Sequence, residues 1–467
     1  MSELCKRGDE ISEPFSTSQI AEIIDAQRHH FRDGQTRPQS ARKAALKAIL
    51  SGLERREDEF IDALAEDLGK PDVEAWLSEI HFLKQELRLM IRKLPSWMKP
   101  RRAGHPIFLL PARSEVRRDP LGVVLVVAPW NYPLQLALSP AIGAIAAGNC
   151  VVIKPAEASP STSRLLAELI AEAVSPSLAT VVTGGAETGQ ALLDQRFDHY
   201  FYTGGEKIGR LVAQAAAREL APCVLELGGK CPAFIDWSCD LDLAVKRIVA
   251  AKFFNAGQTC VAPDFVMIPD FLLHDFTAKL ESAIDKSYGD GPPELARLPN
   301  TSHWDRLQKL IPPDARQIGE DDAETLRMAP RWAIVDWEAS CMQEEVFGPL
   351  LPIVPYPDRS ECLDHLRHLP SPLALYLFSD SDNFIQEAIK HIQSGSVCVN
   401  DVMKQAINLE LPFGGMGASG HGRYRGRSSF ETFTTERPIT RRFSFPDPFD
   451  ARAPYGDLLS TLRKYLK

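Results

Sequence analysis

The residue with the clearest chemistry in this sequence of 467 amino acids is Cys260, in the segment FFNAGQTCVAP at positions 253–263. A free thiol is mostly protonated at neutral pH, so a nucleophilic cysteine needs surroundings that favour the thiolate. The small residues Ala256 and Gly257 let backbone N–H groups come close to the sulfur. The alternative is a buried structural thiol, which is the usual fate of a free cysteine.

A second segment, LELGGK at positions 225–230, places the carboxylate of Glu226 between two leucines and ahead of two glycines. A carboxyl group in apolar surroundings has a raised pKa, which suits a general base that works near neutral pH. An exposed residue at the end of a strand is the alternative interpretation of Glu226.

Glu226 and Cys260 lie 34 positions apart (260 minus 226). Here the sequence resembles the aldehyde dehydrogenase superfamily, in which an L-E-L-G-G-K segment precedes a G-Q-x-C segment at this separation. The resemblance spans almost the whole chain. It favours the class 3-like branch, which has a short N-terminus, the run G-Q-T-C-V-A-P-D and the S-F-E-T-F motif found here at 429–433. This branch is typically dimeric and oxidises medium-chain aliphatic and aromatic aldehydes.

Asn131 follows an apolar run, in the segment APWNYP at positions 128–133. An asparagine at the end of a strand can donate its amide N–H to a developing oxyanion. A turn asparagine is the alternative. The family resemblance implies that this amide and the backbone N–H of Cys260 together form the oxyanion hole.

Two segments suggest a dinucleotide site. The turn TGGEKIG at 203–209 places glycines between a strand and a helix, where a pyrophosphate can approach the helix N-terminus; by itself this is weak evidence of nucleotide binding. The segment IKPAE at 153–157 ends a strand, and a charge pair exposed in a loop is its alternative interpretation. The resemblance implies that Lys154 and Glu157 bind the adenosine ribose. It also assigns to the cofactor the residues Trp130, Gly204, Gly205, Gly209, Glu345 and Phe347.

A carboxylate beside the ribose repels a 2′-phosphate, so we expect NAD as the cofactor, with NADP possible. The resemblance places Glu345 on the nicotinamide ribose and Phe347 against the nicotinamide. Their segment, EEVFGP at 344–349, is otherwise typical of a solvated loop. Tyr132 and Phe413 are expected to line the substrate tunnel, although a core phenylalanine is the alternative for Phe413. The acid at Glu410 departs from the pattern of better-known relatives near the tunnel mouth, so the resemblance does not fix the substrate.

The composition excludes several classes of protein. The net charge is −9 with 44 % hydrophobic residues, so neither disorder nor a nucleic-acid partner is expected. The nine cysteines are scattered without a C-x-x-C pair, which favours reduced thiols in the cytoplasm and no metal site. Residues 1–13 are polar and lack the apolar stretch of a signal peptide, and no apolar run is long enough to span a membrane, so no membrane partner is expected.

The hydrophobic patterns predict an α/β fold. Residues 17–95 show helical stripes that Pro95, Pro100 and Pro106 interrupt. From position 121, buried apolar strands alternate with helices, which predicts a doubly wound parallel sheet. Within this part we expect a helix over 140–148 and a helix capped by Ser161 or Thr162. A second α/β pattern follows, and residues 107–118 are consistent with a β-hairpin.

The expected organisation therefore has a Rossmann-like cofactor domain, a second α/β catalytic domain and a small β oligomerisation arm. We assign residues 1–100 and 120–228 to NAD(P) binding and 229–418 to catalysis. Residues 101–119 and 419–467 form the arm and the C-terminal tail. The assignment of the arm, and with it the homodimer, comes from the resemblance alone.

The predicted reaction is the oxidation of a small-molecule aldehyde to its carboxylic acid. Cys260 attacks the carbonyl, the thiohemiacetal loses a hydride to the nicotinamide, and Glu226 activates the water that hydrolyses the resulting thioester. Two alternatives remain at this point. A dehydrogenase that passes the acyl group to coenzyme A should lack the general base, and a retired enzyme kept as a structural or binding protein should lack the catalytic set.

Overall fold

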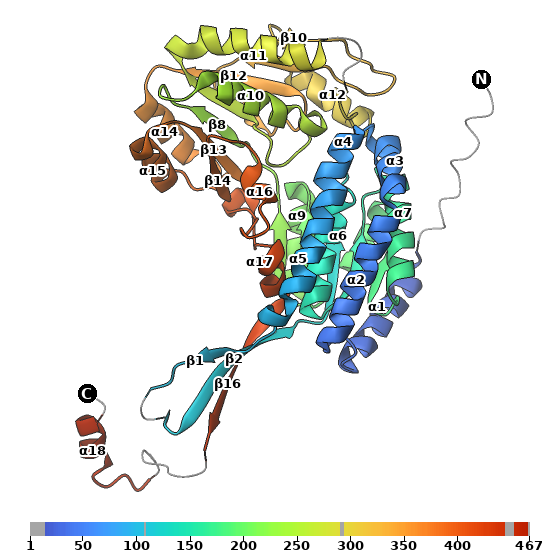
Figure 1. Ribbon diagram of the computed structural model, residues 1–467, viewed down its shortest axis with the longest axis vertical. Coiled ribbons are helices and arrows are strands. Elements are labelled where there is room, and N and C mark those ends of the chain that lie inside the picture. Colours follow the sequence, from blue (N-terminus) through green and yellow to red (C-terminus); the bar gives the residue numbers. More distant parts are fainter. Residues whose placement is uncertain (1–14, 107–108, 290–293, 444–452, 466–467) are drawn as a thin grey trace, which may run out of the picture.

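The computed structural model describes residues 15–106, 109–289, 294–443 and 453–465. Its framework is a six-stranded sheet, a seven-stranded sheet and a separate three-stranded sheet. Figure 1 shows the two large sheets in two adjoining lobes and the small sheet extending away from them. The expected α/β architecture is confirmed.

The N-terminal helices cover one side of the first lobe. They are α1 (Thr17–Arg32), α2 (Gln39–Arg55), α3 (Glu57–Leu68), α4 (Asp72–Ala75), the π-helical η1 (Trp76–His81) and α5 (Phe82–Trp97). Helices α2 and α5 pack against each other and against α6 (Gln135–Ala147) from the sheet domain (Figure 1). Their apolar stripes enter the same core as β3 and β4.

The first large sheet has the strand order β15-β7-β6-β3-β4-β5. The strands are β3 (Val123–Val127), β4 (Cys150–Lys154), β5 (Ala179–Val181), β6 (His199–Thr203), β7 (Cys223–Glu226) and β15 (Gly420–His421). All pairs are parallel except β15 with β7. Helices α6, α7 (Pro160–Ala173), α8 (Ala186–Leu193) and α9 (Glu206–Arg218) connect the strands. Because helices cover both faces, β4 is buried along its whole length, as its continuous apolar sequence predicts.

The second large sheet has the order β10-β11-β12-β9-β8-β13-β14. Its strands are β8 (Pro232–Ile235), β9 (Phe265–Pro269), β10 (Arg316–Gln317), β11 (Arg331–Ile334), β12 (Leu350–Tyr356), β13 (Ala374–Phe378) and β14 (Ser396–Val399). Only the short β10 runs antiparallel to its neighbour. The helices of this lobe are α10 (Leu241–Lys252), α11 (Leu273–Tyr288), α12 (Thr301–Leu310), α13 (Ser340–Gln343), α14 (Arg359–His368), α15 (Asp382–His391) and α16 (Lys404–Ile407), with the 3-10 turns η3 (Phe254–Gly257) and η4 (Asp270–Leu272).

The three-stranded sheet pairs β1 (Arg101–Ala103), β2 (Ala112–Pro120) and β16 (Thr434–Arg442), all antiparallel. The 3-10 turn η5 (Gly417–Ser419) and helix α17 (Gly426–Thr432) precede β16, and α18 (Leu458–Tyr465) lies beyond the far end of this sheet (Figure 1). The hairpin expected over residues 107–118 is not formed within that segment: positions 112–118 belong to the single strand β2, which pairs with β1 and β16, and positions 107–108 lie outside the described residues. The expectation for residues 1–13 also falls outside them.

Three local predictions of helix ends were wrong, and in the first two a distant carboxylate accounts for the observed start of the helix. Helix α6 begins at Gln135 rather than at Pro140, because Glu79 accepts hydrogen bonds from the N–H groups of Leu134 and Gln135 at its start. Helix α7 begins at Pro160, and Asp67 of α3 accepts from the N–H groups of its first turn, so neither predicted cap is used. Helix α5 continues through Pro95 for two more residues.

No helix among the described residues combines the length and the apolar character that a membrane crossing requires.

Candidate active site

The predicted catalytic residues lie at the end of one strand and in two connecting segments. Glu226 is the last residue of β7, Asn131 lies in the bend between β3 and α6, and Cys260 follows α10 and η3. In open α/β sheets, ligands bind outside the carboxyl ends of the parallel strands. The N–H of Gly204 donates to the Glu226 carbonyl at 3.0 Å, so the glycine turn after β6 adjoins the end of β7.

The chain turns through an unusual conformation before Cys260. Asn255 and Ala256 have φ of 53° and 52°, and Gly257 has φ of 74°. Left-handed backbone is unfavourable for residues with a Cβ and accumulates at functional sites. A Cβ at position 257 would lie 2.3 Å from the Gly348 carbonyl oxygen, so only glycine fits there. This turn holds the half-buried Cys260 beside the loop that carries Glu345.

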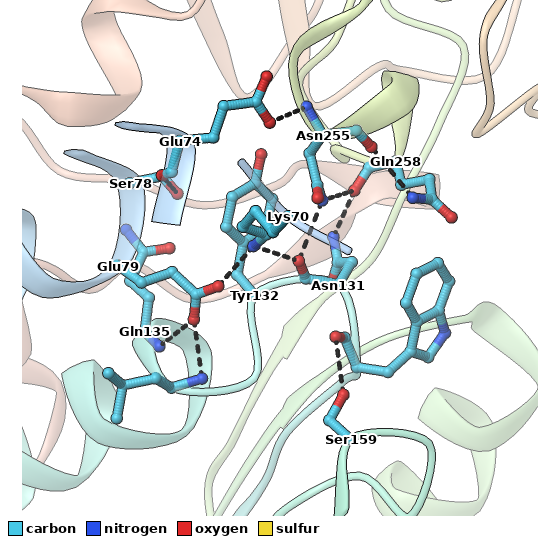
Figure 2. Close-up of polar contacts among 12 residues, drawn as sticks. Lys70, Glu74, Ser78, Glu79, Asn131, Tyr132, Gln135, Ser159, Asn255 and Gln258 are labelled. Atoms are coloured by element: carbon cyan, nitrogen blue, oxygen red, sulfur yellow. Dashed lines mark hydrogen bonds and ion pairs between the residues drawn. The ribbon is translucent and has the colours of Figure 1, made fainter. Parts of the chain in front are cut away.

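Asn131 is fixed at both its side chain and its backbone (Figure 2). Its amide Nδ2 donates to the Gln258 carbonyl at 2.9 Å, two residues before Cys260. Its backbone carbonyl accepts from Lys70 Nζ at 3.1 Å and from Asn255 Nδ2 at 3.0 Å. Because an amide nitrogen carries two hydrogens, the bond to Gln258 occupies one and leaves the second N–H for another acceptor.

Glu226 is only 3 % exposed, and neither carboxylate oxygen has a hydrogen-bond partner among the described residues. Burial raises the pKa of this carboxyl well above its ordinary value, and the positive charges of Arg425 and Arg423 lower it in part. Burying a carboxyl group without a hydrogen-bond partner destabilises the folded protein, so such a group is expected mainly at functional sites. Its raised pKa suits an acid–base role near neutral pH.

The thiol of Cys260 is the second group whose protonation the site controls. Burial, then the charges of Glu345 and Glu226, raise its pKa to about 12, while Arg425 lowers it. A negative charge on Glu226 thus disfavours the Cys260 thiolate, because like charges repel. The resting thiol is therefore protonated and must lose its proton before it attacks a carbonyl.

The predicted phosphate turn has the features of an anion site. Gly204 has φ of 154°, a conformation open to glycine alone, and Gly205 is the N-cap of α9 without any side-chain cap. A Cβ added at Gly205 would meet nothing within 4 Å, so there is open space beside the start of the helix. A Cβ at Gly209 would lie 2.9 Å from Leu227, which lets α9 pack closely on the strand. The turn fits a pyrophosphate.

Lys154 and Glu157, the pair that the family resemblance assigns to the adenosine ribose, lie at and just after the carboxyl end of β4. Lys154 ends β4 and is buried, and its Nζ donates to the Pro155 carbonyl at 3.0 Å and to Glu157 at 3.2 Å. The Glu157 side chain remains largely exposed. The pair therefore presents a fixed cation and an accessible carboxylate, which are suitable groups for ribose hydroxyls.

Glu345 and Phe347 approach from the second lobe. A Cβ at Gly228 would lie 2.0 Å from Glu345 Oε2, so the glycine permits the carboxylate to reach this position. Burial raises the pKa of Glu345 to about 8, and the Gly229 N–H lowers it in part. Phe347 packs edge-on against Trp130 at 5.8 Å, which brings together two aromatic side chains from different lobes.

The two predicted substrate-pocket residues are both buried. The Tyr132 hydroxyl hydrogen-bonds with Thr259 Oγ1 at 2.6 Å, beside the nucleophile. Phe413 packs against Tyr424 at 5.6 Å and lies 4.3 Å from the Arg425 guanidinium. Glu410 is exposed and lies apart from these contacts.

The sequence interpretation missed several residues of this region. Arg425 is buried and its charge acts on both Glu226 and Cys260. His303 packs on Trp130 at 5.1 Å, and Gly228 makes room for Glu345. The glycine lies inside the quoted LELGGK segment, but no local signal marks the arginine or the histidine. Within the described ranges, no group of three or more His, Cys, Asp or Glu side chains is arranged to hold a metal ion.

Comparisons with known proteins agree with the fold and identify the family. The aldehyde dehydrogenase family model matches residues 12–439. Human aldehyde dehydrogenase family 3 member B1 is 41 % identical over 91 % of this chain and 92 % of its own length. The substrate-bound AldH of Staphylococcus aureus is 35 % identical with a TM-score of 0.92, covering 96 % of this chain and 99 % of that one. The NAD+ complex of Mycobacterium tuberculosis aldehyde dehydrogenase is 28 % identical with a TM-score of 0.83, covering 93 % and 92 %.

The fold and the site define an oxidoreductase with a dinucleotide-type domain beside a cysteine-containing catalytic lobe. The chain belongs to the aldehyde dehydrogenase family. The predicted reaction class, NAD(P)-dependent oxidation of an aldehyde, is confirmed, and the coenzyme A-acylating and non-catalytic alternatives are not favoured.

Proposed function

We propose that Cys260, Asn131 and Glu226 are the nucleophile, an oxyanion donor and the general base of this aldehyde dehydrogenase. The observation that carries the proposal is the buried carboxyl of Glu226 at the end of β7, which has no hydrogen-bond partner among the described residues and whose charge raises the pKa of the Cys260 thiol. A coenzyme A-acylating enzyme has no need of such a base.

The Cys260 thiol first releases its proton to solvent water. The resulting thiolate forms a carbon–sulfur bond with the aldehyde carbonyl, and the electron pair of the C=O bond moves to oxygen. The free N–H of the Asn131 amide and the backbone N–H of Cys260 stabilise that oxyanion. A bound nicotinamide dinucleotide supplies the oxidation by accepting a hydride. Glu226 then takes a proton from the water that attacks the thioester carbon, and the carboxylic acid leaves as the sulfur–carbon bond breaks.

The cofactor is NAD, with NADP as a weaker alternative. The turn at Gly204, Gly205 and Gly209 is suited to the pyrophosphate, and Lys154 and Glu157 to the adenosine ribose. Glu345 is assigned to the nicotinamide ribose, and Trp130 and Phe347 to the nicotinamide end. The exposed Glu157 carboxylate supports NAD because it would repel a 2′-phosphate. The related M. tuberculosis enzyme was solved with NAD+.

The substrate class is a medium-chain aliphatic or aromatic aldehyde. The aromatic side chains of Tyr132 and Phe413 near the thiol support an apolar pocket. The experiment is an NAD(P)H absorbance assay with a panel of aldehydes, each with NAD and with NADP, and with and without coenzyme A. We expect acid formation with NAD and no requirement for coenzyme A. A product that forms only with coenzyme A would overturn the role of Glu226.

The assembly is a homodimer formed through the arm of residues 101–119 and 419–467, attached to a cofactor domain of residues 1–100 and 120–228 and a catalytic domain of residues 229–418. The support is the three-stranded sheet that projects from the body (Figure 1), with most of β16 exposed in the single chain. Sedimentation equilibrium tests it; a monomer at micromolar concentration would reject this assignment of the arm.

The compartment is the cytoplasm. Eight cysteines lie in the described part of the chain, and all are free thiols. A reducing compartment keeps such thiols in this state. Cell fractionation of a tagged chain tests the assignment.

A further inference from the structure

A buried ion pair lies directly behind the proposed oxyanion donor. Lys70, between α3 and α4, and Glu79, in η1, have side chains with no exposed surface. The Lys70 Nζ donates to Glu79 Oε1 at 2.5 Å and to the Asn131 backbone carbonyl at 3.1 Å. The Tyr132 ring covers the ammonium at 4.2 Å. Figure 2 shows the lysine between the carboxylate and the asparagine.

The ion pair is anchored to the sheet domain through Glu79. Its second oxygen, Oε2, accepts from the N–H groups of Leu134 and Gln135 at 2.9 and 3.2 Å, at the start of α6. A carboxylate at a helix N-terminus is stabilised by the helix dipole and by the unpaired N–H groups. The residue lies in a π-helical turn, a rare conformation that is frequent at functional sites.

The same carbonyl is tied to the nucleophile loop on its other side. Asn255 Nδ2 donates both to the Asn131 carbonyl at 3.0 Å and to the Gln258 carbonyl at 3.2 Å. Asn131 Nδ2 donates to that Gln258 carbonyl as well. The preceding carbonyl, that of Trp130, accepts from Ser159 Oγ at 3.2 Å. The Asn131 peptide is therefore held from both lobes, and Lys70 is its only charged donor among the described residues.

We propose that Lys70 is a positioning residue, which fixes the Asn131 amide in the oxyanion hole by holding its backbone carbonyl. The inference rests on the proposed role of Asn131. Lys70 acts through Asn131 and does not touch the substrate. Glu79 supplies the counter-charge and the link to α6.

Two physical arguments favour this role over one in stability alone. A buried ion pair contributes little net stability compared with apolar residues of the same size, because both charges lose their hydration. Oxyanion stabilisation, in contrast, depends steeply on where the donor lies, since a misplacement of about 1 Å can lower the rate by about 100-fold. A charged donor fixed on the neighbouring carbonyl restricts that displacement.

The test is a double-mutant cycle between Lys70→Met and Asn131→Ala, measured as kcat/KM for an aldehyde with NAD. If Lys70 acts through the amide, Lys70→Met lowers kcat/KM by about tenfold or more in the otherwise unchanged chain. It then has an effect of less than about threefold in the Asn131→Ala chain. Equal losses in the two backgrounds would overturn the inference.

The cycle also separates this inference from the proposed function. No loss from Asn131→Ala alone would remove Asn131 from the oxyanion hole, whatever Lys70 does. A loss from Asn131→Ala together with unchanged kcat/KM for Lys70→Met would reject the positioning role alone.

Lys70→Met leaves the Glu79 charge buried without a partner, so a second variant guards against misfolding. Lys70→Met/Glu79→Gln removes both charges and keeps a side-chain oxygen to accept from the first turn of α6. We expect this double variant to fold, as judged by circular dichroism. We also expect it to lose kcat/KM as Lys70→Met does, and to show no such further loss when Asn131→Ala is already present. A folded double variant with normal kcat/KM would contradict the proposal.

A second readout distinguishes positioning from general damage to the loop. Alkylation of Cys260 by iodoacetamide develops no oxyanion, so its rate, followed by peptide mass spectrometry, should stay within about twofold in the Lys70 variants. A parallel fall in alkylation and in aldehyde oxidation would show a damaged thiol site and overturn the inference. Arg331→Met, which breaks the ion pair between the buried Arg331 of β11 and the partly exposed Asp321, is the control and should leave both rates unchanged.

Discussion

The amide of Asn131 donates its hydrogen bond to the carbonyl of Gln258 across 2.9 Å, joining the first large sheet to the turn that carries Cys260. The hydrogen bond therefore links the proposed oxyanion donor to the segment that precedes the nucleophile. The same Gln258 carbonyl also accepts from the side chain of Asn255, a left-handed residue of that turn.

Asn131→Ala should lower turnover by roughly 100-fold, because a preorganised oxyanion donor typically lowers the activation barrier by about 3 kcal/mol. The measurement is kcat for a saturating aldehyde, with circular dichroism to confirm the fold. A loss smaller than about tenfold would take the amide out of the oxyanion hole.

Gly228→Ala should displace Glu345, because the added Cβ would lie 2.0 Å from its carboxylate oxygen. We expect KM for NAD to rise by about tenfold, the effect of losing one hydrogen bond to a charged group. Gly104→Ala is the matched control, since a Cβ there meets nothing within 4 Å. Normal NAD affinity in Gly228→Ala would argue against a cofactor contact by Glu345.

Glu157→Gln should narrow the preference for NAD over NADP by about fivefold, because the substitution removes a charge that repels the 2′-phosphate. The ratio of kcat/KM for the two cofactors measures it. The exposed Glu361 of α14 offers a control, Glu361→Gln, that removes the same charge from another part of the surface. An unchanged ratio would argue against a contact between Glu157 and the adenosine ribose.

Arg425→Met should move the rate–pH profile to higher pH. The arginine lowers the pKa of both Glu226 and Cys260, so its removal raises both values. The base and the thiol act when deprotonated. The rising limb of the plot of kcat against pH therefore moves to higher pH as their pKa values rise. Arg425→Lys keeps the charge and should retain more of the original profile. A shift to lower pH in Arg425→Met would contradict these electrostatics.

Much of the fold could be predicted from the sequence, because strands that are buried on both faces appear as continuous apolar runs. The continuous apolar run of β3 and the extended pattern of β13 need no information from elsewhere in the chain. Helix ends were less predictable. The start of α6 depends on Glu79, a carboxylate 55 residues before Leu134, and no local motif encodes that contact.

The site residues also fall into two groups, those that could be predicted from the sequence and those that could not. The roles proposed for Cys260 and Glu226 could be inferred because their short segments resemble those of a known family. Arg425 and Lys70 could not, because each acts through a contact between distant parts of the chain. Their sequence surroundings carry no pattern of charge or spacing that marks a site.

The most direct test of the account is the reaction of Glu226→Gln with an aldehyde and NAD under rapid mixing. Glutamine keeps the shape of the side chain but cannot accept the proton from water, so thioester hydrolysis should stop while Cys260 still attacks. We predict an NADH burst equal to the enzyme concentration, little further turnover, and an acyl mass on the peptide that contains Cys260. An unimpaired steady-state rate, or an acyl group on another residue, would contradict the mechanism.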